Sequence, residues 1–237
     1  MLTGDQIYAD DVAGPMLQAI HQVIELLGLY GETFDGVKFK NSDELYAKEN
    51  RYYTRKEILP RTKVGKKWYR RGGVKHIFTS AFVKNHLVTF AEWMAMYLLV
   101  WSPALWDFIE YDSMKIPVKY KQIYEKELTC IHEFRKDLPM VQRLFAHIPA
   151  YMIFDDHDVT DDWNLTAKWE HRAYGNAFTK RIIGNGLMAY FLCQGWGNAP
   201  HVFDEAFMSS AQQYALQPDQ PNHDRFIDTL LDFRHWH

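Results

Sequence analysis

The chain has 237 residues, of which 47% are hydrophobic and 24% are charged. This composition excludes a disordered chain, whose signature is few apolar residues and a high net charge. Lys and Arg number 27 against 30 Asp and Glu, so the formal net charge of −3 gives no global basic field for nucleic acid. The longest apolar stretch, between Trp93 and Trp101, is too short for a membrane span of about 20 residues.

Compartment and oligomeric state stay open at this level. Two cysteines, Cys130 and Cys193, cannot build a disulfide framework, and this favours a reducing cytoplasm. The chain begins almost directly with a chemically dense loop, so we expect that any targeting segment would lie upstream of it. No pattern in the sequence indicates how many copies associate.

Apolar residues recur three to four positions apart over most of the chain, which predicts helices. The predicted helices cover about 15–28, 85–101, 118–136, a segment opened by Pro139, 167–192 and 223–233. A proline suits the first turn of a helix, so Pro139 predicts a new helix rather than a continuation. Gly184 and Gly186 predict an interruption of the helical stretch around them.

Two short segments are typical of strands. Residues 1–3 resemble the end of a strand, and residues 149–154 form an apolar run bounded by a proline and by acids. Each of them leads directly into an acidic loop. Because ligands bind beyond the carboxyl ends of strands in open α/β sheets, we expect the two loops to meet in space.

A basic, aromatic segment at about 50–76 lies within what is otherwise a single domain over 1–237. Gly72 and Gly73 predict the turn of a short hairpin inside it. The segment is either a flap that attracts phosphate or a solvated surface insertion, and charge runs of this kind favour the second interpretation.

The two acidic loops carry most of the chemistry. The first, residues 4–11, contains Asp5, Tyr8, Asp10 and Asp11; the second, residues 155–162, contains five aspartates and His157. Clustered carboxylates are costly unless cations or protons neutralise them, and hard cations prefer oxygen ligands. Neighbouring acids would raise the pKa of His157, which suits a proton donor near neutral pH. The alternative is that such aspartates only cap helices and turns.

Both loops resemble a known enzyme family. Residues 4–10 resemble the GDQIYAD motif of the alkaline phosphatase D (PhoD-like) family, within the calcineurin-like metallophosphoesterase superfamily. Residues 154–158, followed by Trp163, resemble the family's W-D-D-H-[DE] segment, with Phe154 in place of its first Trp. Residues 92–98 and 184–196 are also similar to family sequence, so the resemblance spans most of the chain.

The resemblance implies an α/β fold, in which this helix-rich chain is part of a β-sandwich flanked by helices, and it also implies roles for five residues. Asp5 and Asp156 match metal ligands, and Tyr8 matches a tyrosine that supplies a phenolate to ferric iron. His157 matches the histidine that assists the leaving group, and Asp158 matches the acid that orients it. The implied metals are iron with calcium, or another divalent pair.

Two parts of the family pattern are missing from the sequence. The family's first metal motif precedes residues 4–10 of this chain, and its late histidine motifs, of the G-D-x-H and G-H-x-H kind, do not occur. The chain is therefore expected to be the central part of a longer enzyme and to be inactive in isolation.

The predicted function is metal-dependent hydrolysis of a phosphomonoester or phosphodiester. The alternative is a non-catalytic helical module, or inactive fragment, that binds cations weakly. Specific nucleic-acid binding is not expected. Metal content distinguishes the two functions, because stoichiometric iron favours the enzyme.

Overall fold

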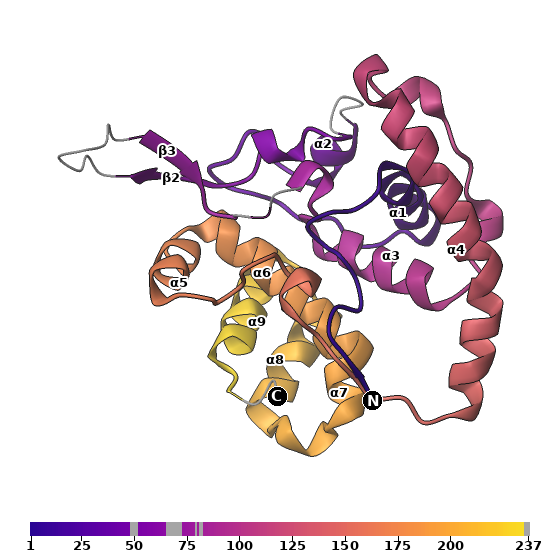
Figure 1. Cartoon of the computed structure of the whole chain (residues 1–237). Helices are drawn as coiled ribbons and strands as arrows, with labels where there is room; N and C mark the ends of the chain where they lie inside the picture. Colours follow the sequence, from indigo (N-terminus) through magenta and orange to yellow (C-terminus); the bar gives the residue numbers. More distant parts are fainter. Residues whose placement is uncertain (48–51, 65–72, 79, 81–82, 235–237) are drawn as a thin grey trace.

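The computed structural model describes residues 1–47, 52–64, 73–78, 80 and 83–234, and helices dominate them (Figure 1). The longer helices are α1 (Gly14–Leu27), α3 (Phe90–Trp101), α4 (Lys121–His147), α6 (Ala177–Tyr190), α8 (Glu205–Leu216) and α9 (Gln220–Asp232). The shorter ones are α2 (Ser42–Ala47), α5 (Ala167–Tyr174) and α7 (Trp196–Asn198). The strands are β1 (Leu2–Thr3), β2 (Arg61–Val64), β3 (Gly73–His76) and β4 (Met152–Ile153).

The expected α/β sandwich is wrong. In the described part of the chain, β1 pairs in parallel with β4 and β2 pairs antiparallel with β3, and neither sheet has a third strand. A sandwich needs two larger sheets whose inner faces supply the core. Here helices supply it: α1 packs on α3 and α4, α6 packs on α3 and α9, and α8 packs on α9. The fold is α-dominated.

Helix α3 begins later than its apolar pattern predicts. Thr89 caps it, because the Thr89 side chain accepts a hydrogen bond from the Glu92 backbone N–H while the Glu92 carboxylate accepts one from the Thr89 N–H. This reciprocal capping box satisfies two N–H groups that a helix start leaves free. The apolar residues just before Thr89 are buried in a loop instead of in the helix.

Pro139 lies inside α4 and does not open a new helix. Pro139 is exposed, so water can solvate the backbone carbonyl that loses its N–H partner. Side chains on both sides of it also contact the rest of the molecule, because Leu138 is buried and the ring of Phe145 lies edge-on to Trp101 at 5.2 Å between centroids.

Gly184 and Gly186 lie within α6 and do not interrupt it; the helical stretch instead breaks before Ala177. A Cβ atom added at Gly184 would come within 2.5 Å of Ile227 on α9. A Cβ atom at Gly186 would come within 3.2 Å of the Trp93 indole on α3. The two glycines therefore allow α6 to approach the helices on either side of it.

The expected hairpin in the basic segment is present as β2 and β3, which project from the helices (Figure 1). Of the two glycines expected in the turn, Gly73 instead begins β3, and Gly72 lies outside the described residues. One basic residue of the segment, Arg55, is not solvated: it is fully buried and paired with Glu92.

No helix in the described ranges combines the length and the apolar character that crossing a membrane requires.

Candidate functional site

The parallel pair of β1 and β4 brings the two acidic loops together. Leu2 lies opposite Met152 and Thr3 opposite Ile153, so both strands deliver their loops at the same edge. A further backbone hydrogen bond joins the loops beyond the strands, because the Ala9 N–H donates to the His157 carbonyl at 2.9 Å. Segments about 150 residues apart in sequence are therefore fixed side by side.

Asp158 holds the two loops in this arrangement. Its carboxylate accepts hydrogen bonds from the backbone N–H groups of Gln6 and Ile7 in the first loop, at 3.1 Å each, and of Asp155 in the second, at 3.0 Å. The side chain is buried, and this burial raises the pKa of Asp158 to about 7 despite the hydrogen bonds. Because these hydrogen bonds join backbone groups of both loops, Asp158 links the first loop to the second.

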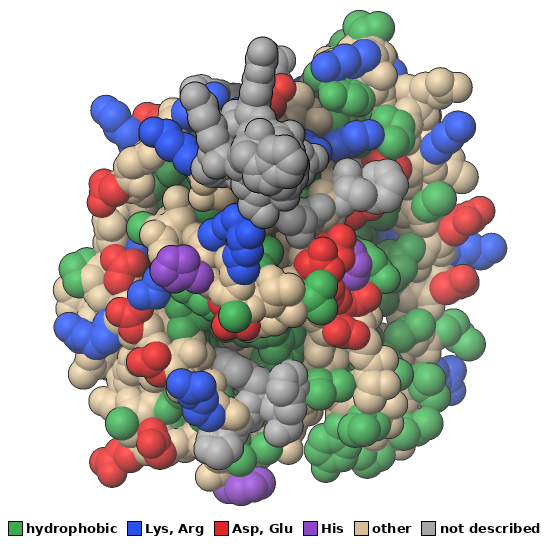
Figure 2. All heavy atoms as spheres, turned by 60° about the vertical axis from the view of Figure 1, so that its left-hand side comes forward, with side chains coloured by type: hydrophobic (Ala, Val, Ile, Leu, Met, Phe, Trp, Pro, Cys, Tyr) green, Lys and Arg blue, Asp and Glu red, His purple; other side chains and the backbone are tan. Residues whose placement is uncertain are grey.

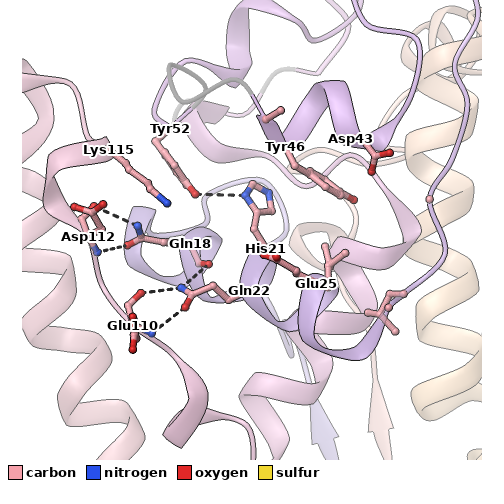
Figure 3. A pocket seen from close by; sticks show the side chains of 15 residues that line it. Gln18, His21, Gln22, Glu25, Asp43, Tyr46, Tyr52, Glu110, Asp112 and Lys115 are labelled. Carbon is pink, nitrogen blue, oxygen red and sulfur yellow. Dashed lines mark hydrogen bonds between the residues drawn. The ribbon is translucent and has the colours of Figure 1, made fainter.

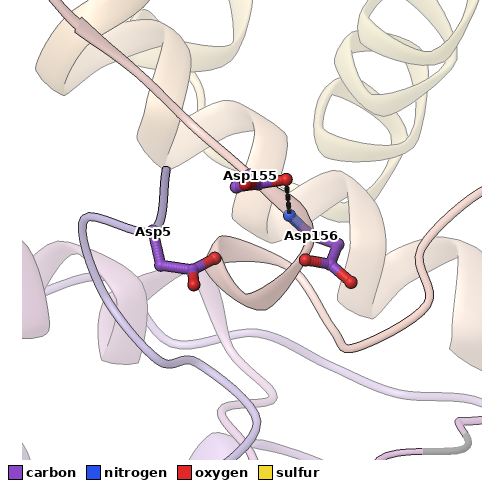
Figure 4. A group of neighbouring side chains, drawn as sticks. All are labelled: Asp5, Asp155 and Asp156. Carbon is purple, nitrogen blue, oxygen red and sulfur yellow. Dashed lines mark hydrogen bonds between the residues drawn. The ribbon is translucent and has the colours of Figure 1, made fainter. Parts of the chain in front are cut away.

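Three carboxylates converge where the loops meet (Figure 4). One oxygen from each of Asp5, Asp155 and Asp156 lies within 4.8 Å of the other two, and these are the residues that could share a metal ion in the described part of the chain. The Asp5 Oδ1 atom is buried and has no hydrogen-bond partner there. Such an atom is expected to have a cation or a proton as its partner.

Tyr8 lies beside this cluster. The interaction with the Asp5 carboxylate raises the pKa of the Tyr8 phenol, because a phenolate next to a carboxylate is disfavoured. Half of the Tyr8 side chain is exposed, and its ring centroid lies 4.8 Å from that of His157. Tyr8 is thus placed between the carboxylates and the histidine.

His157 is held by Asp10. Its Nδ1 atom lies 3.0 Å from Asp10 Oδ1, and the fully buried Asp10 also accepts the Asp161 N–H at 3.0 Å. Burial alone would lower the pKa of His157, but the hydrogen bond to Asp10 and the nearby carboxylates raise it overall. The carboxylate expected to orient His157 was that of Asp158, whereas the contact in this structure comes from Asp10.

The structure therefore brings together Asp5, Tyr8, Asp156 and His157. Asp158 does not join this group; its carboxylate links the two loops that carry them. Two residues of this site received no role from the sequence. Asp155 is a third carboxylate of the cluster, and its signals in the sequence were its position next to Asp156 and its place in the W-D-D-H-like segment. Asp10 ends the first loop's motif, and no local spacing relates it to a histidine 147 residues away.

The acids also shape the surface of the molecule. Figure 2 shows acidic side chains gathered beside a histidine on this face. Asp156 accepts the Asp162 N–H at 2.8 Å and Asp155 accepts the Asp156 N–H at 3.0 Å, so part of the second loop is ordered by its own carboxylates. Both are capping contacts of the kind that the alternative interpretation predicts, because Asp155 is the N-cap of the 3₁₀ turn Asp156–Asp158, but neither uses Asp5.

A cavity of about 760 Å³ lies elsewhere, between α1, α2 and the segment before α4 (Figure 3). His21 stands in it, 2.9 Å from the buried Glu92, which also pairs with Arg55. Burial lowers the pKa of His21, so this imidazole is neutral near pH 7. Among the described residues, the carboxylates that line this cavity do not converge as those of the acidic loops do, and the acidic loops are therefore the candidate functional site.

Comparisons with known proteins add no relative: no family model matches the chain, and no match is found among curated proteins or solved structures. The functional interpretation therefore depends on the residues of the two loops.

Proposed function

We propose that the chain is a metal-dependent phosphoesterase whose site is formed by the two acidic loops. The observation that carries the proposal is the convergence of Asp5, Asp155 and Asp156, from loops distant in sequence, beside a histidine held by a buried aspartate. Neither acidic loop supplies this arrangement by itself. The resemblance of both loops to PhoD-like motifs supports the same reaction.

The donor atoms fit a hard cation. Asp5, Asp155 and Asp156 would hold it through carboxylate oxygens, and the partnerless Asp5 Oδ1 atom would gain a ligand bond. Tyr8, beside Asp5, would add a phenolate, which suits ferric iron in particular, with calcium or another divalent ion as its companion. When bound, such a cation draws electron density from phosphoryl oxygens and makes water easier to deprotonate.

His157 would serve the leaving group. In the hydrolysis, the oxygen of water bonds to phosphorus, the ester P–O bond breaks, and the departing oxygen receives a proton. The raised pKa of His157 favours the protonated imidazole that can give this proton, and Asp10 fixes its orientation through Nδ1. The products are an alcohol and a phosphate, or a phosphomonoester if the substrate is a diester.

Metal content is the first test. We expect the chain purified from iron-supplemented cells to carry iron, and Asp5→Asn to lose most of it. Asp137→Asn, which changes an exposed aspartate on α4, is the matched control and should keep the metal. A phenolate bound to ferric iron gives a visible absorption band, so Tyr8→Phe should bleach it. Equal metal content in all variants would contradict the proposed site.

Hydrolysis is the second test. The family motifs that the sequence lacks predict an inactive chain, but the convergence of the carboxylates beside His157 leads us to expect metal-dependent hydrolysis of a simple phosphomonoester or diester, lost in Asp5→Asn and kept in Asp137→Asn. Stoichiometric metal without any turnover would refute the proposed reaction and support the non-catalytic module. The experiment therefore separates the two functions that the sequence left open.

A further inference from the structure

A second cavity opens directly beside the proposed metal site. It has a volume of about 420 Å³ and lies between the second acidic loop, α5 and the end of α9. Asp155 and Asp156, two of the three clustered carboxylates, form part of its wall. A cavity of this size falls in the range of about 300–1,000 Å³ that small ligands occupy. Any molecule bound at the carboxylates has this space next to it.

The wall of this cavity is aromatic. Phe154, Trp163, Tyr174 and Phe233 line it, and all except the buried Phe154 keep part of their surface exposed. The Phe154 and Trp163 rings are packed at 5.2 Å between centroids. Partly exposed aromatic side chains around one cavity are typical of a site that receives an apolar, flat group.

The polar atoms of these rings are already engaged with each other. The Trp163 indole N–H donates to the Tyr174 hydroxyl at 3.2 Å, and that hydroxyl donates to Asn164 Oδ1 at 2.7 Å. This chain fixes the two rings before any ligand arrives, which lowers the entropic cost of binding. The cavity therefore offers ring surfaces held in fixed positions beside the polar side chains of Asp155, Asp156, Asn164 and Arg234.

Charge is arranged along the same cavity. The carboxylates of Asp155 and Asp156 lie on one part of its wall, whereas Arg234 is the basic residue among those that line it. An ester whose phosphate lies at the acidic loops with a metal would have its organic group within reach of the aromatic side chains.

We infer that this cavity is the subsite for the organic part of the substrate, and that this part is a planar aromatic group. The inference rests on the proposed function, because it assigns the substrate class of the same site. Trp163 is its specificity-determining residue: it contacts the organic group and leaves the phosphorus chemistry to the acidic loops.

The test compares two esters with similar leaving groups. Naphthylmethyl phosphate and ethyl phosphate both release an ordinary alcohol, so their difference in kcat/KM measures the subsite and not the reactivity of the ester. We expect the naphthylmethyl ester to be favoured by at least about tenfold, which corresponds to about 1.4 kcal/mol. Trp163→Ala should remove most of this preference, measured as the ratio of the two kcat/KM values. Phe108→Ala, which removes an exposed ring outside the cavity, should keep the preference.

Binding gives a readout that does not need turnover. The non-hydrolysable naphthylmethylphosphonate should bind the metal-loaded chain about tenfold more tightly than ethylphosphonate by calorimetry, and Trp163→Ala should equalise them. Turnover of both esters with equal kcat/KM would overturn the subsite but leave the phosphoesterase intact. Preferential binding of the aromatic phosphonate without turnover would refute the reaction but support the subsite. Equal binding of the two phosphonates would overturn the subsite whether or not turnover occurs.

Discussion

His157 differs from His21 and His86 in what surrounds it. His21 and His86 are buried, and burial lowers the pKa of both. His157 is only partly buried and contacts Asp10, so its pKa is raised instead. The same side chain is thus a neutral packing element in one place and a candidate proton donor in the other.

The first prediction concerns this proton donor. His157→Ala should lower kcat by about 10²–10⁴-fold, the usual contribution of general acid catalysis. Its metal content should stay unchanged, because the clustered carboxylates are intact. Steady-state kinetics and metal analysis of the same preparation check both statements. Loss of metal in this variant would mean that His157 is a ligand.

The second prediction concerns Asp10 as a positioning residue. Asp10→Asn keeps the size of the side chain but removes the charge that favours the protonated imidazole. The pKa of His157, followed by NMR titration, should therefore fall toward its ordinary value. A His157 titration that is identical in the variant and in the parent chain would show that Asp10 does not set this pKa.

At the scale of helices, the glycines Gly184 and Gly197 differ in how much space surrounds them. Gly184 on α6 faces Ile227 on α9 so closely that a Cβ atom would lie 2.5 Å from its side chain. At Gly197, in the short α7, an added Cβ atom would meet nothing within 4 Å. Helix propensity disfavours glycine at both positions, and only the packing around each glycine distinguishes them.

The third prediction uses this pair. Gly184→Ala should destabilise the chain by about 1–3 kcal/mol, because overpacking a core contact outweighs the better helix propensity of alanine. Gly197→Ala should be neutral or stabilise by up to about 1 kcal/mol. Urea unfolding of the two variants measures both changes in the free energy of unfolding. A stabilised Gly184→Ala chain would contradict the close packing of α6 and α9.

The fourth prediction concerns the contact of the same two helices through His223. Burial and the charge of Arg181 lower the pKa of this side chain from 6.5 to about 3, and His223 Nε2 lies 2.8 Å from Asn185 Oδ1. As pH falls below about 6.5, the unfolded chain binds a proton that the folded chain refuses. Stability should then be lost by about 1.4 kcal/mol per pH unit from this group.

The free energy of unfolding has to be compared between the parent chain and a His223 variant. Burial raises the pKa of the nearby Glu32 to about 7, so Glu32 stabilises the folded chain as pH falls and opposes the effect of His223. We expect the parent chain to lose stability relative to His223→Gln as pH decreases from 6.5 to 4.5 in urea unfolding. His171→Gln, at an exposed position, should follow the parent chain. A pH-independent difference between the His223 variant and the parent chain would show that His223 titrates normally.

At the scale of the whole molecule, the second half of α4 exposes an apolar stripe. Met140 and Leu144 lie four residues apart on the helix, Ile148 is the C-cap residue that follows it, and at least half of each side chain is exposed. Residues at this spacing lie on one face of a helix. Contiguous exposed apolar surface of this kind promotes association.

The fifth prediction is therefore that the chain self-associates through this stripe. Light scattering after size exclusion should show a mass that rises with concentration, and Leu144→Glu should reduce the rise. Leu216→Glu changes another exposed leucine, on α8, and is the matched control. A monomer at all concentrations would refute the prediction.

Local patterns in the sequence predicted much of the secondary structure. The spacing of apolar residues and Gly28 placed α1 almost as it is found, because a helix and its left-handed C-cap depend on neighbours in the chain. The acidic motifs likewise pointed to the two loops that the structure brings together. The same patterns failed at Pro139 and Gly184, where contacts with distant side chains outweigh local preference.

Only the tertiary structure decided how the site is assembled. The sequence by itself determined which residue types stand in the two loops, and it placed each loop after a short apolar segment. It did not determine the fold class, because a short apolar segment can become a strand of a large sheet or a buried segment among helices, and contacts with the rest of the chain select between the two. Nor could it pair Asp10 with His157 or add Asp155 to Asp5, since these contacts cross about 150 residues and exist only once β1 lies beside β4.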